Sequence, residues 1–347
     1  MVLRIMKAAV RVGLGMVSCA AVVWSAGLGL GLGLGLGLNR AAAAESWNLY
    51  IHQSAPQFTT SLGGQQLADG ITGASGGALE VRRHLAGTLQ IKSSDITQAV
   101  GQNIVQMGDD LFYSGNVPIG ALLRLPFLIQ SYEEYAKAEA VVMPYIEKAY
   151  AANGVIVLGG YLYPLQYVWA RGAVGSLDDI KGMKVRVSSP EQGAFVDRLG
   201  GNPVTMSASE VPSALDRGVV DGLVTGSVGA DLWQDLLKSG YLIGLSFNNA
   251  YIIANAEAFN GLPAELQATV RAEVTKAALW NQETMRSDDG KIIDRLKADP
   301  KFAVAEPTDA ERTRAAAALA PYWEEWATER GPEAVEALQK VRALLGR

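Results

Sequence analysis

Arg186 is the side chain whose setting in the sequence best suits a chemical role. It lies in the alternating stretch Lys184–Val187, which predicts a short strand with its valines facing a core and the arginine on the other face. Ser189 follows within one turn as the predicted N-cap of a helix. A guanidinium at that place could bind a carboxylate together with the helix N-terminus. The alternative is a solvated arginine paired with a neighbouring acid such as Glu191.

Patterns that would indicate catalysis or a metal site are missing from the sequence. It holds two histidines and one cysteine, and it contains no H-E-x-x-H or P-loop motif. Its adjacent acid pairs are poor catalytic dyads because neighbouring side chains on a strand or helix point apart. Examples are Asp109-Asp110, Glu133-Glu134 and Asp178-Asp179. We therefore expect no cofactor, no metal and no enzymatic activity.

The N-terminal segment has the features of an export signal. Three basic residues precede an uncharged stretch from Val12 to Leu38, and the run Ala41–Ala44 offers a small-residue cleavage site. We expect a signal peptide over residues 1–44, with an uncleaved anchor as the alternative. Cleavage would remove four basic side chains, the cysteine and no acid, which leaves 26 basic and 35 acidic residues and a net charge of −9. This charge argues against nucleic acid as a partner.

The region around Arg186 predicts a parallel α/β unit. Ser189, Pro190 and Gln192 form the start of a helix with a capping box, and a second capping box begins at Ser207. Strands are expected at Pro203–Met206 and Val219–Val224. Strand, helix, strand, helix and strand in succession favour a parallel sheet, whose ligands bind beyond the carboxyl ends of the strands.

The remaining sequence predicts a second α/β lobe that is not contiguous in the chain. A long helix begins at Pro263 and runs past Met285, and a shorter helical segment is expected at Leu67–Ala74. Late strands are needed to complete the early half, which indicates two lobes with crossed connections and a hinge. The other expected strands lie near Thr88–Ile91 and within Trp47–Pro56, where a loop follows the strand, Gln102–Gly115, Gly154–Gly172 and Asn248–Asn255.

Several linked motifs give the chain a family resemblance. The stretch SLDDIKGMKVRV, then LGGNPVTM, SEVPSAL and VVDG, resembles the extracytoplasmic solute-binding subunits of TRAP transporters, the DctP-like family. The resemblance extends from Trp47 to the C-terminal tail. It implies a two-lobe periplasmic-binding-protein fold with crossed hinge strands and a long helix spanning both lobes. We expect lobe I at residues 45–163 plus 250–290, and lobe II at 164–249 plus 291–347.

The same resemblance implies a function. A periplasmic protein, expected to be a monomer, would close on an organic acid held by Arg186. It would deliver the acid to the small and large membrane subunits of a permease driven by a sodium gradient. A signalling receptor component, or less plausibly an exported enzyme, is the alternative.

Departures from the family pattern bear on the ligand. Gln166 stands where sialic-acid-binding members have a second arginine, Thr225 stands near a usual asparagine, and Ala208 replaces a frequent aromatic. Fewer charged contacts favour a small monocarboxylate, with an apolar or aromatic body. An aromatic wall could come from Tyr161, Tyr163, Trp169 and Trp233, where core packing is the alternative. Further candidate ligand contacts are Gln53, Ser54, Asp109 and Tyr113.

Overall fold

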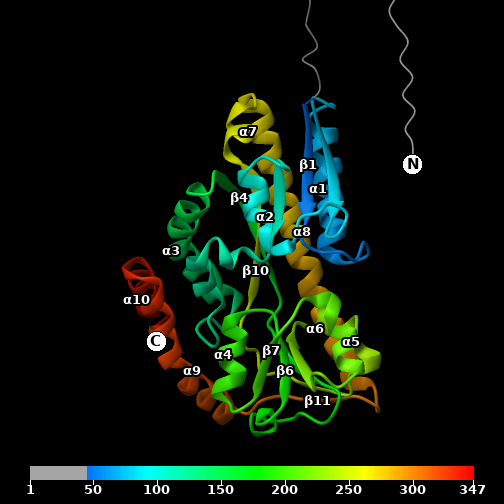
Figure 1. Cartoon of the computed structure of the whole chain (residues 1–347), viewed down its shortest axis with the longest axis vertical. Helices are drawn as coiled ribbons and strands as arrows, with labels where there is room; N and C mark the ends of the chain where they lie inside the picture. Colours follow the sequence, from blue (N-terminus) through cyan, green and yellow to red (C-terminus); the bar gives the residue numbers. More distant parts are fainter. Residues whose placement is uncertain (1–44) are drawn as a thin grey trace, which may run out of the picture. The chain divides into compact units, whose positions relative to one another are not determined.

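The computed structural model describes residues 45–347, whose strands form two mixed sheets (Figure 1). The predicted signal peptide, residues 1–44, lies outside the described residues. Among residues 45–347, no helix combines the length and the apolar character that crossing a membrane requires.

The first sheet has the strand order β2-β1-β3-β10-β4 and is covered by helices on both faces. Alternation sets the two faces: Leu49 and Ile51 pack with helices α1 and α8, whereas Tyr50 between them packs with α2 and α3. Strand β10 runs antiparallel to β3 and β4, and β1 runs parallel to β2 and β3. The strands are β1 Glu45–Ile51, β2 Leu79–Leu85, β3 Met107–Asp110, β4 Val155–Tyr163 and β10 Asn248–Asn255. The helices are α1 Thr59–Ala74, α2 Ile96–Gly101, α3 Tyr132–Ala151 and α8 Ala264–Ala298.

The second sheet has the order β11-β9-β5-β8-β6-β7 and contains the predicted parallel unit. Strand β6 is parallel to β7 and β8, which confirms the strand–helix–strand interpretation around Arg186. Strand β5 is antiparallel to β8 and β9. The strands are β5 Tyr167–Ala170, β6 Lys184–Val187, β7 Asn202–Thr205, β8 Gly222–Thr225, β9 Ser239–Tyr241 and β11 Ala303–Ala305. The short helices are α4 Pro190–Arg198, α5 Val211–Asp216 and α6 Ser227–Asp231.

Two chain segments cross between the sheets and are hydrogen-bonded to each other. The first joins β4 to β5, and the second joins β9 to β10. The backbone N–H of Gln166 donates to Ser246 O (2.9 Å), and Leu245 N–H donates to Gln166 O (2.8 Å). The chain then passes through α7 (Ala256–Gly261) into the 35-residue α8, which packs on α1 and β4 of the first lobe and on α6 and β11 of the second. The predicted two-lobe fold with crossed strands and a long shared helix is confirmed.

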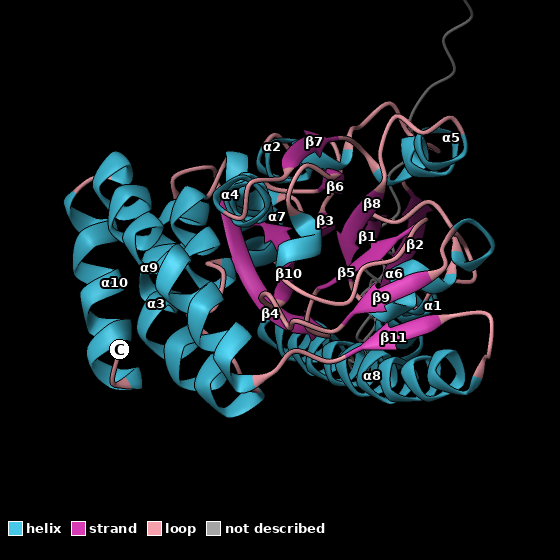
Figure 2. Cartoon of the chain, turned by 90° about the horizontal axis from the view of Figure 1, so that it is seen from below, coloured by secondary structure: helices cyan, strands magenta, loops and turns pink. Residues whose placement is uncertain are grey.

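The last two helices, α9 (Asp309–Arg330) and α10 (Pro332–Leu345), form a hairpin that lies beside α3 (Figure 2). Lys148 of α3 pairs with Glu333 of α10, and Tyr145 donates to Glu336 (3.2 Å). Helix α9 reaches the second lobe, where Glu311 accepts from Leu177 N–H (3.2 Å). The hairpin therefore contacts both lobes, and the residue boundaries proposed for the lobes stay a prediction.

Two local predictions were wrong. The strand expected near Thr88–Ile91 is instead β2 at Leu79–Leu85, whose charged sequence does not show the usual apolar alternation of a strand. The later segment forms only a single β-bridge, between Ala86 and Leu89. Helix α1 begins at Thr59, eight residues before the prediction. Its first half lacks apolar periodicity, but Gly63 and Gly64 let it approach Asn281 and Ile51 closely.

Candidate functional site

Arg186 is a buried cation with no ion-pair partner in the part of the chain that the structure describes. Its side chain is 5% exposed, and its Nε and Nη2 both donate to Met206 O, at 3.1 and 2.9 Å. Burial lowers the pKa of the guanidinium to about 10, opposed by the charge of Glu210. Among residues 45–347, no carboxylate lies within salt-bridge distance of it. A buried charge without a partner is costly, so a bound anion would be strongly favoured here.

The structure does not support the solvated alternative for Arg186. Glu191, the acid considered as its partner, is itself buried and accepts from Trp326 Nε1 (3.2 Å). The nearest basic group to Glu191 is Arg330, at 3.9 Å. Arg186 is thus available to a ligand.

The turn that positions Arg186 follows the predicted capping pattern with one change. Ser189 is the N-cap of α4, and its Oγ accepts from Gln192 N–H (3.3 Å). In a capping box, the side chain of Gln192 would accept a hydrogen bond from the N–H of Ser189. Here, Gln192 Oε1 accepts from the N–H of Ser188 instead (2.8 Å). This arrangement fixes the strand-to-helix turn directly after Arg186.

The carboxyl edges of the two sheets meet at the crossing segments. Thr225, at the end of β8, pairs with Tyr167 at the start of β5, and β6 runs alongside β8 in the same direction. The carboxyl ends of β6 and β8 therefore lie at the start of β5, which follows the end of β4 by three residues. Gln166 lies in this crossing, 4% exposed, with Nε2 donating to Pro164 O (2.9 Å). Arg186, Thr225 and Gln166 thus belong to one region of the second lobe.

The other residues singled out in the second lobe lie in or near its core. Trp169 is fully buried, donates to Thr225 O (3.0 Å) and packs against Tyr167 and Phe302. Trp233 is half-buried against the same cluster. Ala208 is exposed and opens the turn Ala208–Glu210. Ligand contacts by these residues stay predictions.

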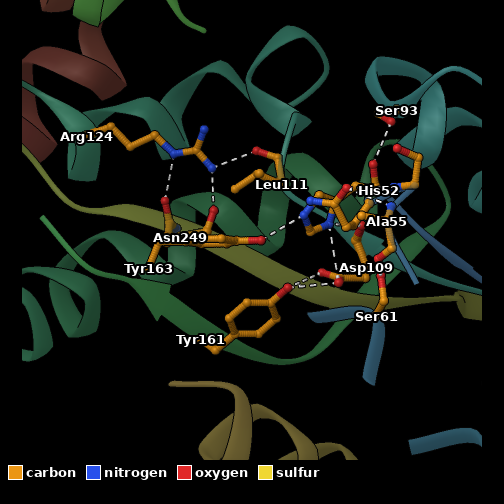
Figure 3. A network of polar contacts seen from close by, with 12 residues as sticks. His52, Ala55, Ser61, Ser93, Asp109, Leu111, Arg124, Tyr161, Tyr163 and Asn249 are labelled. Atoms are coloured by element: carbon orange, nitrogen blue, oxygen red, sulfur yellow. Dashed lines mark hydrogen bonds and ion pairs between the residues drawn. The ribbon is translucent and has the colours of Figure 1, made fainter. Parts of the chain in front are cut away.

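In the first lobe, the ends of β1, β3 and β4 are joined by a buried polar network (Figure 3). Tyr161 donates to both carboxylate oxygens of Asp109 at 2.8 Å. His52 lies 3.3 Å from the same carboxylate through Nδ1, and its Nε2 lies 2.8 Å from the hydroxyl of Tyr163. Asp109 and Tyr163 are therefore already engaged, and their first role is to fix these three strand ends.

The remaining first-lobe candidates differ in exposure. Gln53 Oε1 accepts from the N–H groups of Ser54 (2.8 Å) and Ala55 (3.1 Å), which orders the loop after β1. Ser54 is exposed. Tyr113 is fully buried and donates to Asn249 Oδ1 (2.7 Å). Of these residues, Gln53 and Ser54 are the ones that solvent reaches.

Sequence reasoning missed Arg124. It ends the 3₁₀ segment Pro118–Arg124, is 5% exposed, and stacks 4.4 Å above the ring of Tyr113. Its Nε donates to Asn249 Oδ1 and its Nη2 to Leu111 O, both at 2.8 Å (Figure 3). A lone arginine inside the apolar run Ala121–Ile129 was the available signal.

A pocket of about 400 Å³ lies elsewhere, between the loop after β1 and helices α6 and α8. Its size suits a small molecule. Its charged side chains are already paired, however, Arg295 with Asp231 and Lys291 with Asp288. Arg186 does not line this pocket, and the unpaired cation identifies the candidate site better than the volume does. Residues 45–347 also contain no group of three His, Cys, Asp or Glu that could hold a metal.

Asp110 is expected to make stability depend on pH. Burial raises the pKa of this carboxyl to about 7, and the charge of Asp109 adds to the rise. The hydrogen bond from Thr97 (2.5 Å) and the charges of His52 and Arg124 act in the opposite direction and lower the pKa. Between about pH 4 and 7 the folded protein keeps a proton that the unfolded chain releases, so this contribution to stability is lost as the pH rises through that range. The loss is at most about 4 kcal/mol.

Thermal unfolding from pH 4.5 to 8 measures this dependence. We expect Asp110→Asn to flatten the fall in melting temperature, whereas the exposed Asp178→Asn keeps it. An unchanged slope in Asp110→Asn would mean that another buried acid, such as Glu139 or Asp289, is responsible; burial raises the pKa of both.

Two α/β lobes joined by crossed segments and a shared helix define a hinged solute-binding protein. The chain belongs to the bacterial extracellular solute-binding protein family 7, DctP, whose model matches residues 51–329. It is a periplasmic solute-binding protein of the TRAP type, in a family that binds solutes and does not transform them. The predicted family and the absence of enzymatic function are confirmed.

Relatives illustrate the family. The C4-dicarboxylate-binding periplasmic protein DctP of Rhodobacter capsulatus is 24% identical over 309 residues, which cover 85% of this chain and 90% of that protein. A monocarboxylate 2-oxoacid-binding periplasmic protein of Nostoc sp. is 25% identical, covering 69% and 68% of the two chains. The crystal structure of DctP7, a Bordetella pertussis extracytoplasmic solute receptor binding pyroglutamic acid, is similar with a TM-score of 0.78 at 26% identity, over 86% of this chain and all of that one.

Proposed function

We propose that this protein captures a small organic acid between its two lobes and delivers it, as a monomer, to the small and large membrane subunits of a TRAP permease. The observation that carries the proposal is the buried guanidinium of Arg186, which has no acidic partner in the described part of the chain, residues 45–347. The three relatives described above bind carboxylates, according to their names. A ligand carboxylate would accept from the guanidinium and meet the N-terminus of α4, and closure of the lobes would remove water from the pair.

The finer proposal is a small monocarboxylate. A second arginine is absent at Gln166, which offers an amide in place of a charge. The half-buried Tyr163, at the end of β4, could contact an apolar ligand body. Trp169 is fully buried, so it adds little to such a wall. Because few charged groups lie near Arg186, we favour a small ligand with one carboxylate over a densely hydroxylated sugar acid.

A thermal-shift screen tests the proposal. The purified protein is mixed with carboxylates of two to eight carbons and, as matched controls, with the primary amides of the same acids. We expect at least one acid to raise the melting temperature by a few degrees and its amide to have no effect, because a ligand at one hundred times its Kd adds about 2.7 kcal/mol. Stabilisation by amides or amines, and by no acid, would refute the proposal.

A further inference from the structure

Arg124 is a second buried arginine that has no acidic partner among the described residues. Among residues 45–347, no carboxylate lies within salt-bridge distance of its guanidinium, which donates to Asn249 Oδ1, Asn249 O and Leu111 O. The carboxylate of Asp109 is occupied by Tyr161 and His52. Asp110, at the next position, is fully buried, and its raised pKa means that it is only partly ionised near neutral pH. The charge of Arg124 is therefore incompletely compensated by the protein.

Within residues 45–347, one nitrogen of Arg124 donates no hydrogen bond. The recorded hydrogen bonds come from Nε and Nη2. Figure 3 shows the third nitrogen, Nη1, pointing away from both Asn249 and Leu111. The other two nitrogens and the contact with the ring of Tyr113 hold the guanidinium plane fixed. A fixed cation with a spare donor is preorganised for an oxygen acceptor, since ordering it costs little on binding.

The partners of Arg124 place it at the edge of the first sheet that faces the crossing segments. Leu111 follows the last residue of β3, and Asn249 is the second residue of β10, which runs antiparallel to β3. Tyr163, at the end of β4, pairs with Asn248. This is the edge from which the chain crosses to β5 and the second lobe. Arg124 and Arg186 therefore belong to the two sheet edges that meet at the crossing.

We propose that Arg124 is a ligand-binding residue that recognises a second oxygen acceptor on the acid whose carboxylate binds Arg186. The monocarboxylate proposed above would then carry a hydroxyl or oxo oxygen, which a simple alkyl monocarboxylate lacks. A dicarboxylate offers the same kind of acceptor and serves as a probe. This inference rests on the proposed function, and it assigns the specificity for the far end of the ligand to the first lobe. A bridging ligand of this kind would also hold the lobes together.

Calorimetric titration with matched acids tests the assignment. For chains of three to six carbons, the wild-type protein is titrated with the alkyl monocarboxylate, its ω-hydroxy derivative and the dicarboxylate, and each titration is repeated with Arg124→Gln and Arg186→Ala. At one chain length we expect the hydroxy acid or the dicarboxylate to bind at least about tenfold more tightly than the alkyl acid, the effect of a hydrogen bond to a charged group. Arg124→Gln should abolish this ratio and leave the affinity for the alkyl acid nearly unchanged.

The ratio of the affinities of two acids for the same protein separates ligand recognition by Arg124 from any effect of the substitution on folding. If Arg124→Gln weakens all three acids equally, or if the ratio survives, Arg124 has only a structural role and the inference is wrong. An absence of preference in the wild-type protein would also overturn it, while leaving the proposed function intact. If no acid binds the wild-type protein, both proposals fail. If Arg124→Gln does not fold, Arg124→Lys replaces it, because lysine keeps the positive charge but lacks the forked guanidinium. Arg124→Lys should reduce the ratio of the two affinities. Failure of both variants to fold would mean that Arg124 has a structural role, and the inference would be wrong.

Discussion

Replacing Arg186 with alanine is expected to weaken binding of the preferred acid by about 30-fold to several thousand-fold. Loss of one partner of a buried, hydrogen-bonded charge pair costs about 2–5 kcal/mol. The guanidinium donates to Met206 O through Nε and Nη2, so its plane is held in place before the ligand arrives. Isothermal titration calorimetry of both proteins with the best acid from the screen measures the loss.

The apoprotein should not lose stability in this variant. Among residues 45–347, Arg186 has no ion-pair partner, and removing an unpaired buried charge relieves a desolvation cost. Arg198→Ala is a suitable control, because this arginine lies on the adjacent α4 and pairs with Glu325 at the surface. Equal affinities for Arg186→Ala and wild type would show that the anchor lies elsewhere.

Replacing Trp169 with alanine is expected to lower the free energy of unfolding by about 3–5 kcal/mol, the usual cost of removing a large buried aromatic side chain. Trp169 is fully buried in the core of the second lobe. Its ring lies directly against Gly240, and a side chain at position 240 would clash with the ring. Urea unfolding of the variant and of wild type measures the difference.

A ligand-wall role for Trp169 makes a different prediction. If the ring contacted the ligand, Trp169→Phe would reduce affinity while changing stability little. We expect the reverse: affinity close to wild type, with a loss of about 1 kcal/mol from the hydrogen bond to Thr225 O. Strongly reduced affinity in a stable Trp169→Phe protein would restore the wall interpretation.

Local chemistry made much of the second lobe predictable. Ser189 and Ser207 cap their helices as expected, because capping depends on residues three positions apart. The glycine stops at Gly200 and Gly218 have positive φ, at 78° and 68°. The position of Arg186 also followed from a local strand–turn–helix pattern.

Features that depend on distant contacts were harder to predict. Helix α1 gains its first half from packing against Asn281 of α8, more than 200 residues away in the chain. The orientation of Trp169 depends on β9 and Phe302. Likewise, Arg124 has a role only once Asn249 and Leu111 are brought beside it by the pairing of β3 with β10. No spacing rule within one segment reveals such arrangements.

The most direct test of the central claim is a crystal structure of the protein with the acid that stabilises it most. Capture between the lobes predicts a ligand carboxylate within about 3 Å of the Arg186 guanidinium, at the meeting edges of the two sheets. An acid bound away from Arg186, for example in the pocket between α6 and α8, would contradict the account.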